Sequence, residues 1–264
     1  MIEGILKFLS QSITEGQKVA LVTVTKTSGS SPASPGQMIA VLADGSSVGT
    51  IGGGSSEHDI ITKAVEAIKN GESVFSHSID HAVNGMICGG SMEVFGNIIG
   101  NHLSLCIFGG GHVAQALAVI AVQTGFYVTV VEDRPEFEPY FNSAKYIVCN
   151  PDDYEKIDPA AYADYAVICT RGHSTDYNAL RYCLTKDLKY IGMIGSKPKV
   201  KEVFSDLRND GSTEEQLDSI YAPIGLDIAD AFPKEIAVAI LAEILLIKNK
   251  GKLRHMKQEN SLQA

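Results

Sequence analysis

Three consecutive glycines separate an apolar run from a helical pattern in "LCIFGGGHVAQALA", residues 105–118. The spacing is G-x-G-x-x-A: the first glycine allows a tight turn, and the second lets backbone amides approach a phosphate. The alanine allows close helix–strand packing, and the N-terminus of the following helix favours an anion. A glycine-rich turn with no ligand is the alternative interpretation. The predicted phosphate contacts are Gly109, Gly110, Gly111, His112 and Val113.

Two acidic residues end the next predicted strand, where a dinucleotide fold places its ribose contact. Glu132 and Asp133 lie 23 and 24 residues after Gly109. A carboxylate at this position can accept hydrogen bonds from a ribose diol, whereas Arg134, the next residue, could approach a 2′-phosphate. The sequence therefore predicts a bound nucleotide and leaves its phosphorylation open.

Polar residues also follow the fourth predicted strand, in "CTRGHSTDYNAL". Since ligands of open α/β sheets sit beyond the carboxyl ends of the strands, Thr170, Arg171 and His173 should face the glycine loop. Arg171 can bind a phosphate or carboxylate through two N–H groups, and His173 can carry a proton or bind a metal. Asp176 could instead only cap the following helix.

After the fifth predicted strand, Gly195, Ser196 and Lys197 offer a second anion site at a helix start. For Lys199, two residues further along the chain, the simpler interpretation is that it belongs to a solvated, positively charged surface.

The first 100 residues carry another glycine triplet and one accessible thiol. "GTIGGGSSEHDI" precedes a helix for which serine is the predicted N-cap, and Gly53, Gly54 and Glu57 are its candidate ligand contacts. Cys88 stands next to Gly89 and Gly90, so its thiol could contact a soft metal or a sulfur. It is the predicted metal contact.

These residues are positioned by two predicted domains. Residues 1–100 combine helices with a mostly antiparallel sheet, a smaller α+β domain. Residues 101–264 alternate short apolar strands with helices, which predicts an α/β, Rossmann-like parallel sheet with helices on both faces. A last helix over about residues 233–250 is apolar nearly all round, which favours burial against the sheet or in a homodimer.

Composition excludes several classes of protein. The formal charge of −9, from 31 acidic and 22 basic residues, argues against nucleic acid or an anionic membrane as partner. Five widely spaced cysteines without a C-x-x-C pair indicate a reducing compartment, and Glu3 argues against a signal peptide. The longest apolar stretch is interrupted by Glu243. We therefore expect a cytoplasmic protein. Hydrolase, H-E-x-x-H and Walker A patterns are missing from the sequence.

Taken together, the motifs resemble one family. "GSSPASPGQMIAVLADGSSVGTIGGGSSEHDI", "MICGGSMEVF", "CIFGGGHVAQALA", "TRGHSTDYNAL", "YIGMIGSKPK" and "YAPIGLDIADAFPKEIAVAILAEI" have the order and spacing of the xanthine dehydrogenase accessory factors (XdhC/CoxI type). The resemblance spans nearly the whole chain. It departs from the family at Ser55-Ser56, where many members have a cysteine or an aliphatic pair, and at Ala33-Ser34, where a basic residue is usual.

The resemblance implies a chaperone more than a catalyst. Such a protein binds the molybdenum cofactor (molybdopterin or a dinucleotide form) and delivers it to an apo molybdenum hydroxylase such as xanthine dehydrogenase. A cysteine desulfurase could be a further partner. The cofactor's phosphate end would dock at residues 109–112, and its molybdenum end at the loops of residues 52–57 and Cys88. The alternatives are an NAD(P)-dependent oxidoreductase and a nucleotide-sensing regulatory protein.

Overall fold

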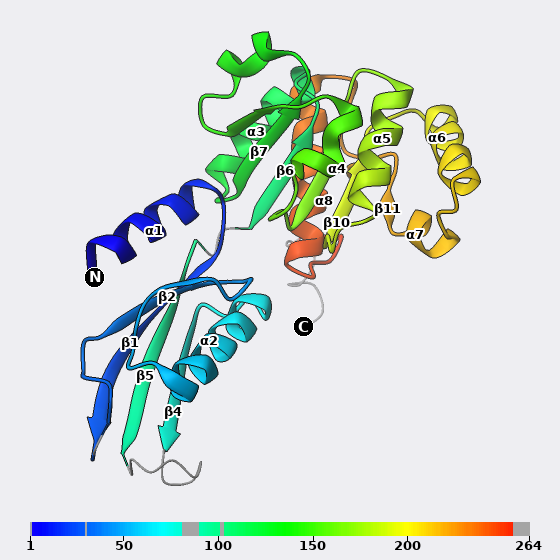
Figure 1. Cartoon of the computed structure of the whole chain (residues 1–264). Helices are drawn as coiled ribbons and strands as arrows, with labels where there is room; N and C mark the ends of the chain where they lie inside the picture. Colours follow the sequence, from blue (N-terminus) through cyan, green and yellow to red (C-terminus); the bar gives the residue numbers. More distant parts are fainter. Residues whose placement is uncertain (1, 30, 81–89, 101–102, 256–264) are drawn as a thin grey trace, which may run out of the picture. The chain divides into compact units, whose positions relative to one another are not determined.

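The computed structural model describes residues 2–29, 31–80, 90–100 and 103–255. The chain divides into two units, Met1–His102 and Leu103–Ala264, each with its own sheet (Figure 1). The boundary lies two residues beyond the predicted one. Among the described residues, no helix has both the length and the apolar character needed to span a bilayer.

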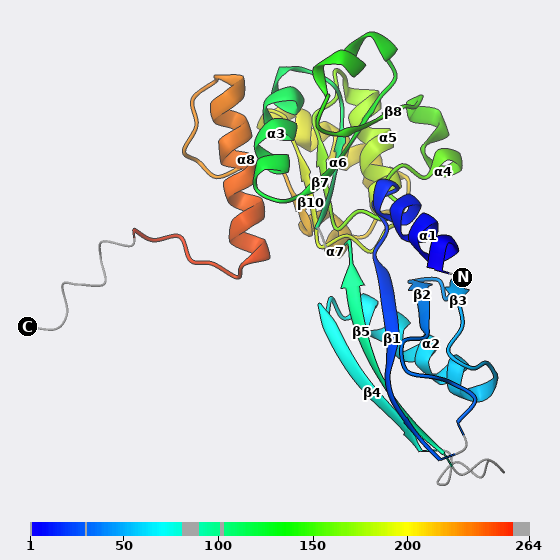
Figure 2. The ribbon, with the colours of Figure 1, turned by 90° about the vertical axis from the view of Figure 1, so that its left-hand side faces the viewer.

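The N-terminal unit is built on a five-stranded antiparallel sheet in the order β3-β2-β1-β5-β4. Helix α2 lies along this sheet (Figure 2). The strands are β1 (Val19–Ser28), β2 (Met38–Leu42), β3 (Ser47–Gly49), β4 (Val74–Asp80) and β5 (Ser91–Ile99), and the helices are α1 (Ile2–Thr14) and α2 (Gly54–Lys69).

Alternation along β1 divides the apolar residues of this unit between two layers. Val22 and Val24 are buried in the cluster that includes α2 residues such as Ile60. Val19 belongs to the other cluster, which α1 closes with Ile5 and Leu9. The period of two along a strand thus places one helix on each side of the sheet.

The C-terminal unit holds a six-stranded parallel sheet in the order β11-β10-β9-β6-β7-β8. Numbered from β6, this is the 3-2-1-4-5-6 order of dinucleotide-binding folds. The strand order therefore reverses between β6 and β9, where such folds bind their ligand. The strands are β6 (Ser104–Phe108), β7 (Tyr127–Glu132), β8 (Lys145–Val148), β9 (Tyr165–Ile168), β10 (Tyr190–Met193) and β11 (Ile220–Tyr221).

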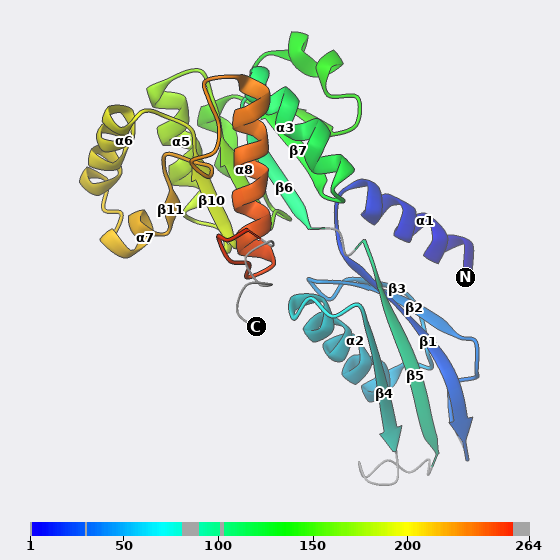
Figure 3. The same ribbon diagram turned by 180° about the vertical axis from the view of Figure 1, so that it is seen from behind.

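Helices cover both faces of the parallel sheet, which confirms the predicted fold class. Helices α3 and α8 lie side by side on one face (Figures 2 and 3). The other face packs against α4, α5, α6 and α7. The connections are α3 (His112–Gln123), η1 (Pro135–Tyr140), η2 (Pro151–Asp153), α4 (Tyr154–Ile157), α5 (His173–Cys183), α6 (Lys197–Asn209), α7 (Glu214–Asp218) and α8 (Pro233–Lys248).

The apolar character of α8 is explained within its own unit. Ala237, Ile240 and Ile244 are buried against the sheet and α3. Of its two acidic residues, Glu243 is buried and accepts hydrogen bonds from Tyr190 Oη at 2.6 Å and from Gly225 N at 3.0 Å. The homodimer inferred from this helix stays a prediction.

Candidate functional site

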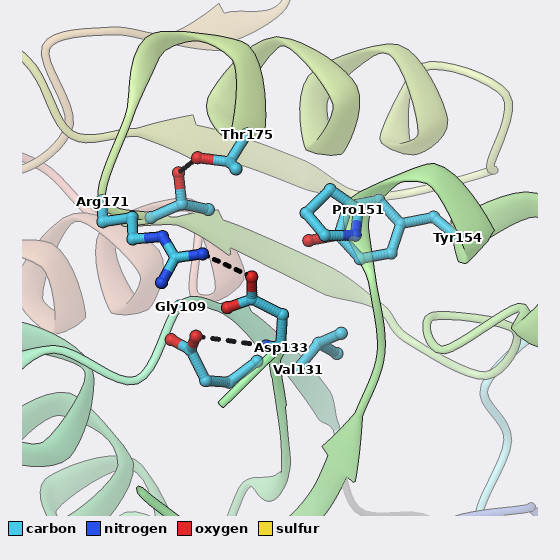
Figure 4. A pocket seen from close by; sticks show the side chains of 9 residues that line it. Gly109, Val131, Asp133, Pro151, Tyr154, Arg171 and Thr175 are labelled. Carbon is cyan, nitrogen blue, oxygen red and sulfur yellow. Dashed lines mark hydrogen bonds and ion pairs between the residues drawn. The ribbon is translucent and has the colours of Figure 1, made fainter. Parts of the chain in front are cut away.

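A pocket of about 250 Å³, open to solvent, lies at the carboxyl ends of β6, β7 and β9, where the strand order reverses (Figure 4). Ligands of open α/β sheets bind at this position. The start of η2 and α4 completes the wall. The lining residues are Gly109, Val131, Glu132, Asp133, Pro151, Tyr154, Thr170, Arg171 and Thr175.

Gly109 joins the floor of the pocket to the neighbouring strand. Its φ is +113°, and a Cβ here would lie 2.4 Å from the carbonyl oxygen of Cys169. Its amide donates to Val131 O at 2.8 Å. A side chain would therefore force β6 and the loop after β9 apart, so the first glycine of the motif is required by packing.

Glu132, the last residue of β7, holds the glycine loop to the end of its strand. Its carboxylate accepts hydrogen bonds from Gly110 N at 2.6 Å and from Asp133 N at 3.1 Å. Arg134 donates twice more, from Nε at 2.8 Å and from Nη2 at 2.9 Å. Although burial disfavours its charge, these hydrogen bonds lower the pKa of Glu132 to about 2. Glu132 is therefore ionised and already bonded on both oxygens.

Arg134 is held in place by its contacts with Glu132 and Phe137. Besides the two bonds to Glu132, its guanidinium lies 4.1 Å from the ring centre of Phe137. The contact with a 2′-phosphate predicted for Arg134 would require breaking this paired arrangement.

Asp133 is the acid whose side chain spans the pocket. Arg171 Nη2 lies 2.5 Å from Asp133 Oδ2, so an ion pair connects the end of β7 with the loop after β9 (Figure 4). The pKa of Asp133 is raised, chiefly because its carboxyl lies beside that of Glu132, with partial burial adding to the effect and Arg171 opposing it.

Thr170 is held in the pocket wall by a buried carboxylate. Its hydroxyl donates to Asp176 Oδ1 at 2.5 Å and lies 2.6 Å from the hydroxyl of Thr175. Asp176 is fully buried, and its second oxygen forms an ion pair with Lys199 of α6. Asp176 therefore anchors the loop after β9, and Lys199 is its counter-ion, whereas a solvated surface was the simpler expectation for this lysine.

Six other predicted contacts lie outside the pocket lining. His173 begins α5, and its Nε2 lies 2.8 Å from Asp206 Oδ2 of α6. His112 is exposed at the first position of α3, and Lys197 is exposed at the first position of α6. Gly195 and Ser196 directly precede α6. Gly111 is the N-cap of α3 without a side-chain cap, and a Cβ there would meet no atom within 4 Å.

In the N-terminal unit too, a carboxylate accepts hydrogen bonds from backbone amides of the glycine loop. Glu57 Oε2 accepts hydrogen bonds from Thr50 Oγ1 at 2.6 Å, Ile51 N at 2.9 Å and Gly53 N at 3.2 Å. Burial opposes the charge, but these bonds hold the pKa of Glu57 below its usual range. Helix α2 begins at Gly54 with Gly53 as N-cap, so the predicted serine N-cap is wrong.

The predicted thiol contact, Cys88, lies outside the described residues. Within the ranges that the structure describes, His, Cys, Asp and Glu side chains form no group of three that could hold a metal ion. The described cysteines are buried, and burial raises the pKa of Cys169 to about 12.

The sequence analysis missed four lining residues, Val131, Pro151, Tyr154 and Thr175. Pro151 and Tyr154 follow the third strand of the unit, β8, and that position was the available signal. Neither residue type suggests ligand chemistry by itself.

Comparisons with known proteins agree with this architecture. Residues 105–244 match the XdhC Rossmann domain, and residues 12–79 match the XdhC and CoxI family. The chain is 32% identical over 242 residues to YqeB of Escherichia coli, an uncharacterized protein, which covers 88% of this chain and 44% of that one. It is 30% identical over 149 residues to a probable xanthine dehydrogenase subunit of Bacillus subtilis, covering 55% of this chain and 43% of the relative. The chain thus spans less than half the length of these two relatives.

A solved structure shares the fold. The crystal structure of a xanthine dehydrogenase from Bacillus halodurans covers 94% of this chain and 96% of its own, with 21% identity and a TM-score of 0.50. The family matches confirm the resemblance found in the sequence. With its glycine loop at the reversal of a parallel sheet and its separate N-terminal unit, this chain belongs to the XdhC and CoxI family.

Proposed function

We propose that this protein is a maturation factor for a molybdenum hydroxylase of the xanthine dehydrogenase type. In this proposal it binds the molybdenum cofactor by its phosphate end and delivers it to the apo-enzyme. The names of the Bacillus relatives supply the association with xanthine dehydrogenase. The residues at the strand ends supply the mode of binding.

The observation that carries the proposal is the pocket where the strand order reverses. Arg171, whose cationic side chain is 53% exposed, lines this pocket, and Gly111, an open glycine position outside the lining, is the N-cap of the helix that follows the glycine loop. Amides at a helix start and a guanidinium fork are the groups that bind a phosphate.

The pocket is open to solvent, and part of its empty space of about 250 Å³ is bulk solvent. A ligand bound there can therefore extend beyond the lining residues. We therefore propose that this pocket holds the phosphate end of the cofactor and that the pterin and molybdenum lie outside it.

The test is the cargo itself. Protein purified from cells supplied with molybdate is assayed for bound molybdenum, pterin and nicotinamide. We expect molybdenum and pterin together, and a loss of about tenfold or more in occupancy for Arg171→Gln, because a charge-assisted contact is worth about 1.5–3 kcal/mol.

Arg181→Gln is the matched control. Arg181 is as exposed as Arg171, at 54% against 53%, and it also pairs with an acid, Glu155, but it lies outside the pocket lining. Purified protein with neither molybdenum nor pterin would contradict the proposal. Bound nicotinamide without molybdenum would favour the oxidoreductase.

A further inference from the structure

We infer that β4, the outer strand of the N-terminal sheet, pairs antiparallel with β4 of a second copy of this chain, so that two five-stranded sheets join into one. The contact belongs to the N-terminal unit and does not depend on what the pocket of the C-terminal unit binds. It places the contact of a homodimer on this strand instead of on helix α8.

Of the strands that the structure describes, β3, β4, β8 and β11 lie at the edges of the two sheets. Natural proteins keep such edges from pairing with other chains by making them very short or by placing lysine, proline or a β-bulge there. β3 has three residues, β11 has two, and β8 has four and begins with Lys145. These three edges are therefore protected.

The edge formed by β4 has none of these protections. The strand extends over seven residues, Val74–Asp80, and contains no proline, lysine or arginine. It pairs with β5 in one continuous register without a bulge, and it is the outermost strand of its sheet in Figures 1 and 3. An edge of this length that is left unprotected is suited to pairing with another strand.

The backbone of β4 alternates between the paired side and the open side. Directly before the strand, Ser73 O accepts a hydrogen bond from Ile98 N at 2.9 Å. From there on, successive residues direct their N–H and C=O groups alternately away from β5 and toward it. The residues directed away are Val74, Ser76, Ser78 and Asp80. Their backbone groups form a row of donors and acceptors along the outer edge of the sheet.

Pairing of β4 with itself is self-complementary in one register. Two antiparallel copies bring all four of these residues opposite one another only when the two-fold axis passes through His77. Phe75 then lies opposite Ile79 of the other copy, and Ser76 lies opposite Ser78. A shift by one residue would set outward groups of one copy against inward groups of the other, and a shift by two would leave outward residues unpaired.

The side chains on both faces agree with this register. Phe75 and Ile79 are 6% and 4% exposed and belong to the apolar cluster that includes α2 residues, so each meets an apolar residue across the joint. Ser76 and Ser78, on the other face, are exposed and small. Residues 74–79 contain no acidic, lysine or arginine side chain, so no like charges of these types face each other.

The size of the contact indicates a reversible dimer. Seven residues at about 3.4 Å each make a ladder about 24 Å long, and a sheet with one helix layer is roughly 20 Å thick. The two copies would therefore bury on the order of 1,000 Å² in total, which is the lower limit for a specific interface. We expect dimers that dissociate on dilution.

Sedimentation equilibrium of the full chain tests the inference at concentrations from about 1 to 200 μM, where an interface of this size associates. Ser76→Pro removes an N–H group that is directed to the open edge, a position at which edge strands tolerate proline. The variant should keep its circular dichroism spectrum, and its dimer dissociation constant should rise at least about tenfold, because symmetry removes the bond twice.

Ser47→Pro is the matched control. Ser47 is an exposed serine in β3, at the opposite edge of the same sheet. Because Leu42 N donates to Ser46 O, the N–H of Ser47 is also directed away from its paired strand. This substitution should leave the dimer unchanged.

His77→Cys gives a second readout that does not depend on how the proline variant folds. Residues directly opposite at a non-hydrogen-bonded position have Cα atoms about 4.5 Å apart, within the range that a disulfide bridges. Mild oxidation should therefore link two copies of this variant to a greater extent than Ser47→Cys or the parent chain, which measures linking through native cysteines.

A monomer throughout the concentration range would overturn the inference. So would a dimer that Ser76→Pro leaves unchanged, or a dimer in which His77→Cys is linked no more than its controls. Either of these last two results would move the contact to another surface, such as α8.

Discussion

Replacing Glu132 by glutamine tests whether a buried carboxylate holds the glycine loop. The wild-type side chain, 5% exposed, accepts hydrogen bonds from the backbone of Gly110 and Asp133 and two from Arg134. Glutamine has nearly the same shape, but it removes the charge and turns an NH2 group toward these donors. The loop therefore loses its charge-assisted bonds without losing volume.

The expected loss can be worked from the pKa of Glu132. It falls from its ordinary value of 4.5 to about 2, and one pKa unit corresponds to about 1.4 kcal/mol. The charge thus contributes about 3 kcal/mol to the free energy of unfolding at neutral pH. For a domain of this size, about 2–4 °C of melting temperature accompany each kcal/mol, so the variant should melt about 6–12 °C lower.

The direction of the pKa shift also determines how the stability difference between wild type and variant changes with pH. A carboxyl with a lowered folded-state pKa stabilises the fold fully above its unfolded pKa, and this contribution disappears as pH falls through the folded value. Calorimetric melting of the C-terminal unit should therefore show a large wild-type-minus-variant difference at pH 7 that shrinks between about pH 4.5 and pH 2. An unchanged melting temperature at pH 7, or a difference independent of pH, would refute the reasoning.

Three further substitutions test the glycine loops of the two units and the buried ion pair of Asp176 with Lys199. Gly109→Ala should lower the melting temperature of the C-terminal unit by several degrees, because φ is +113° and the added Cβ meets a backbone oxygen; Gly111→Ala, with open space, should not. Glu57→Gln should cost the N-terminal unit about 1–2 kcal/mol at pH 7, less at pH 4, as urea unfolding would measure. Lys199→Met leaves Asp176 buried without its cation and should cost about 3–5 kcal/mol in urea unfolding; a loss below 1 kcal/mol would argue against a buried pair.

The parallel sheet could be predicted because its strands are short, apolar and separated by helices at regular spacing. The pattern from residue 105 to 133 contains a strand, a glycine turn, a helix and an acidic strand end in order, and this combination specifies one supersecondary unit. Strand β11 was not predicted because two residues, Ile220 and Tyr221, carry no periodic signal. The serine N-cap failed because a glycine with a positive φ begins α2 one residue before the first serine.

For the polar residues, the sequence predicted where they lie but not which partners they contact. The sequence placed Glu132, Asp133 and Arg134 together at one strand end, but it did not show that Glu132 and Arg134 bond to each other while Asp133 reaches Arg171. Which acid faces the pocket depends on contacts with Gly110 and with Arg171, 38 residues further along the chain. Side-chain partners of this kind belong to tertiary structure and leave no mark in local spacing.

Both glycine loops show why counting free amides does not locate an anion site. A triplet of glycines suggests a row of open donors, yet Glu132 occupies Gly110 N in one unit and Glu57 occupies Gly53 N in the other. A phosphate arriving at either loop would meet an internal carboxylate that already accepts from part of it. At the pocket described here Arg171 is paired with Asp133, so an anion that binds this guanidinium competes with an internal carboxylate as well.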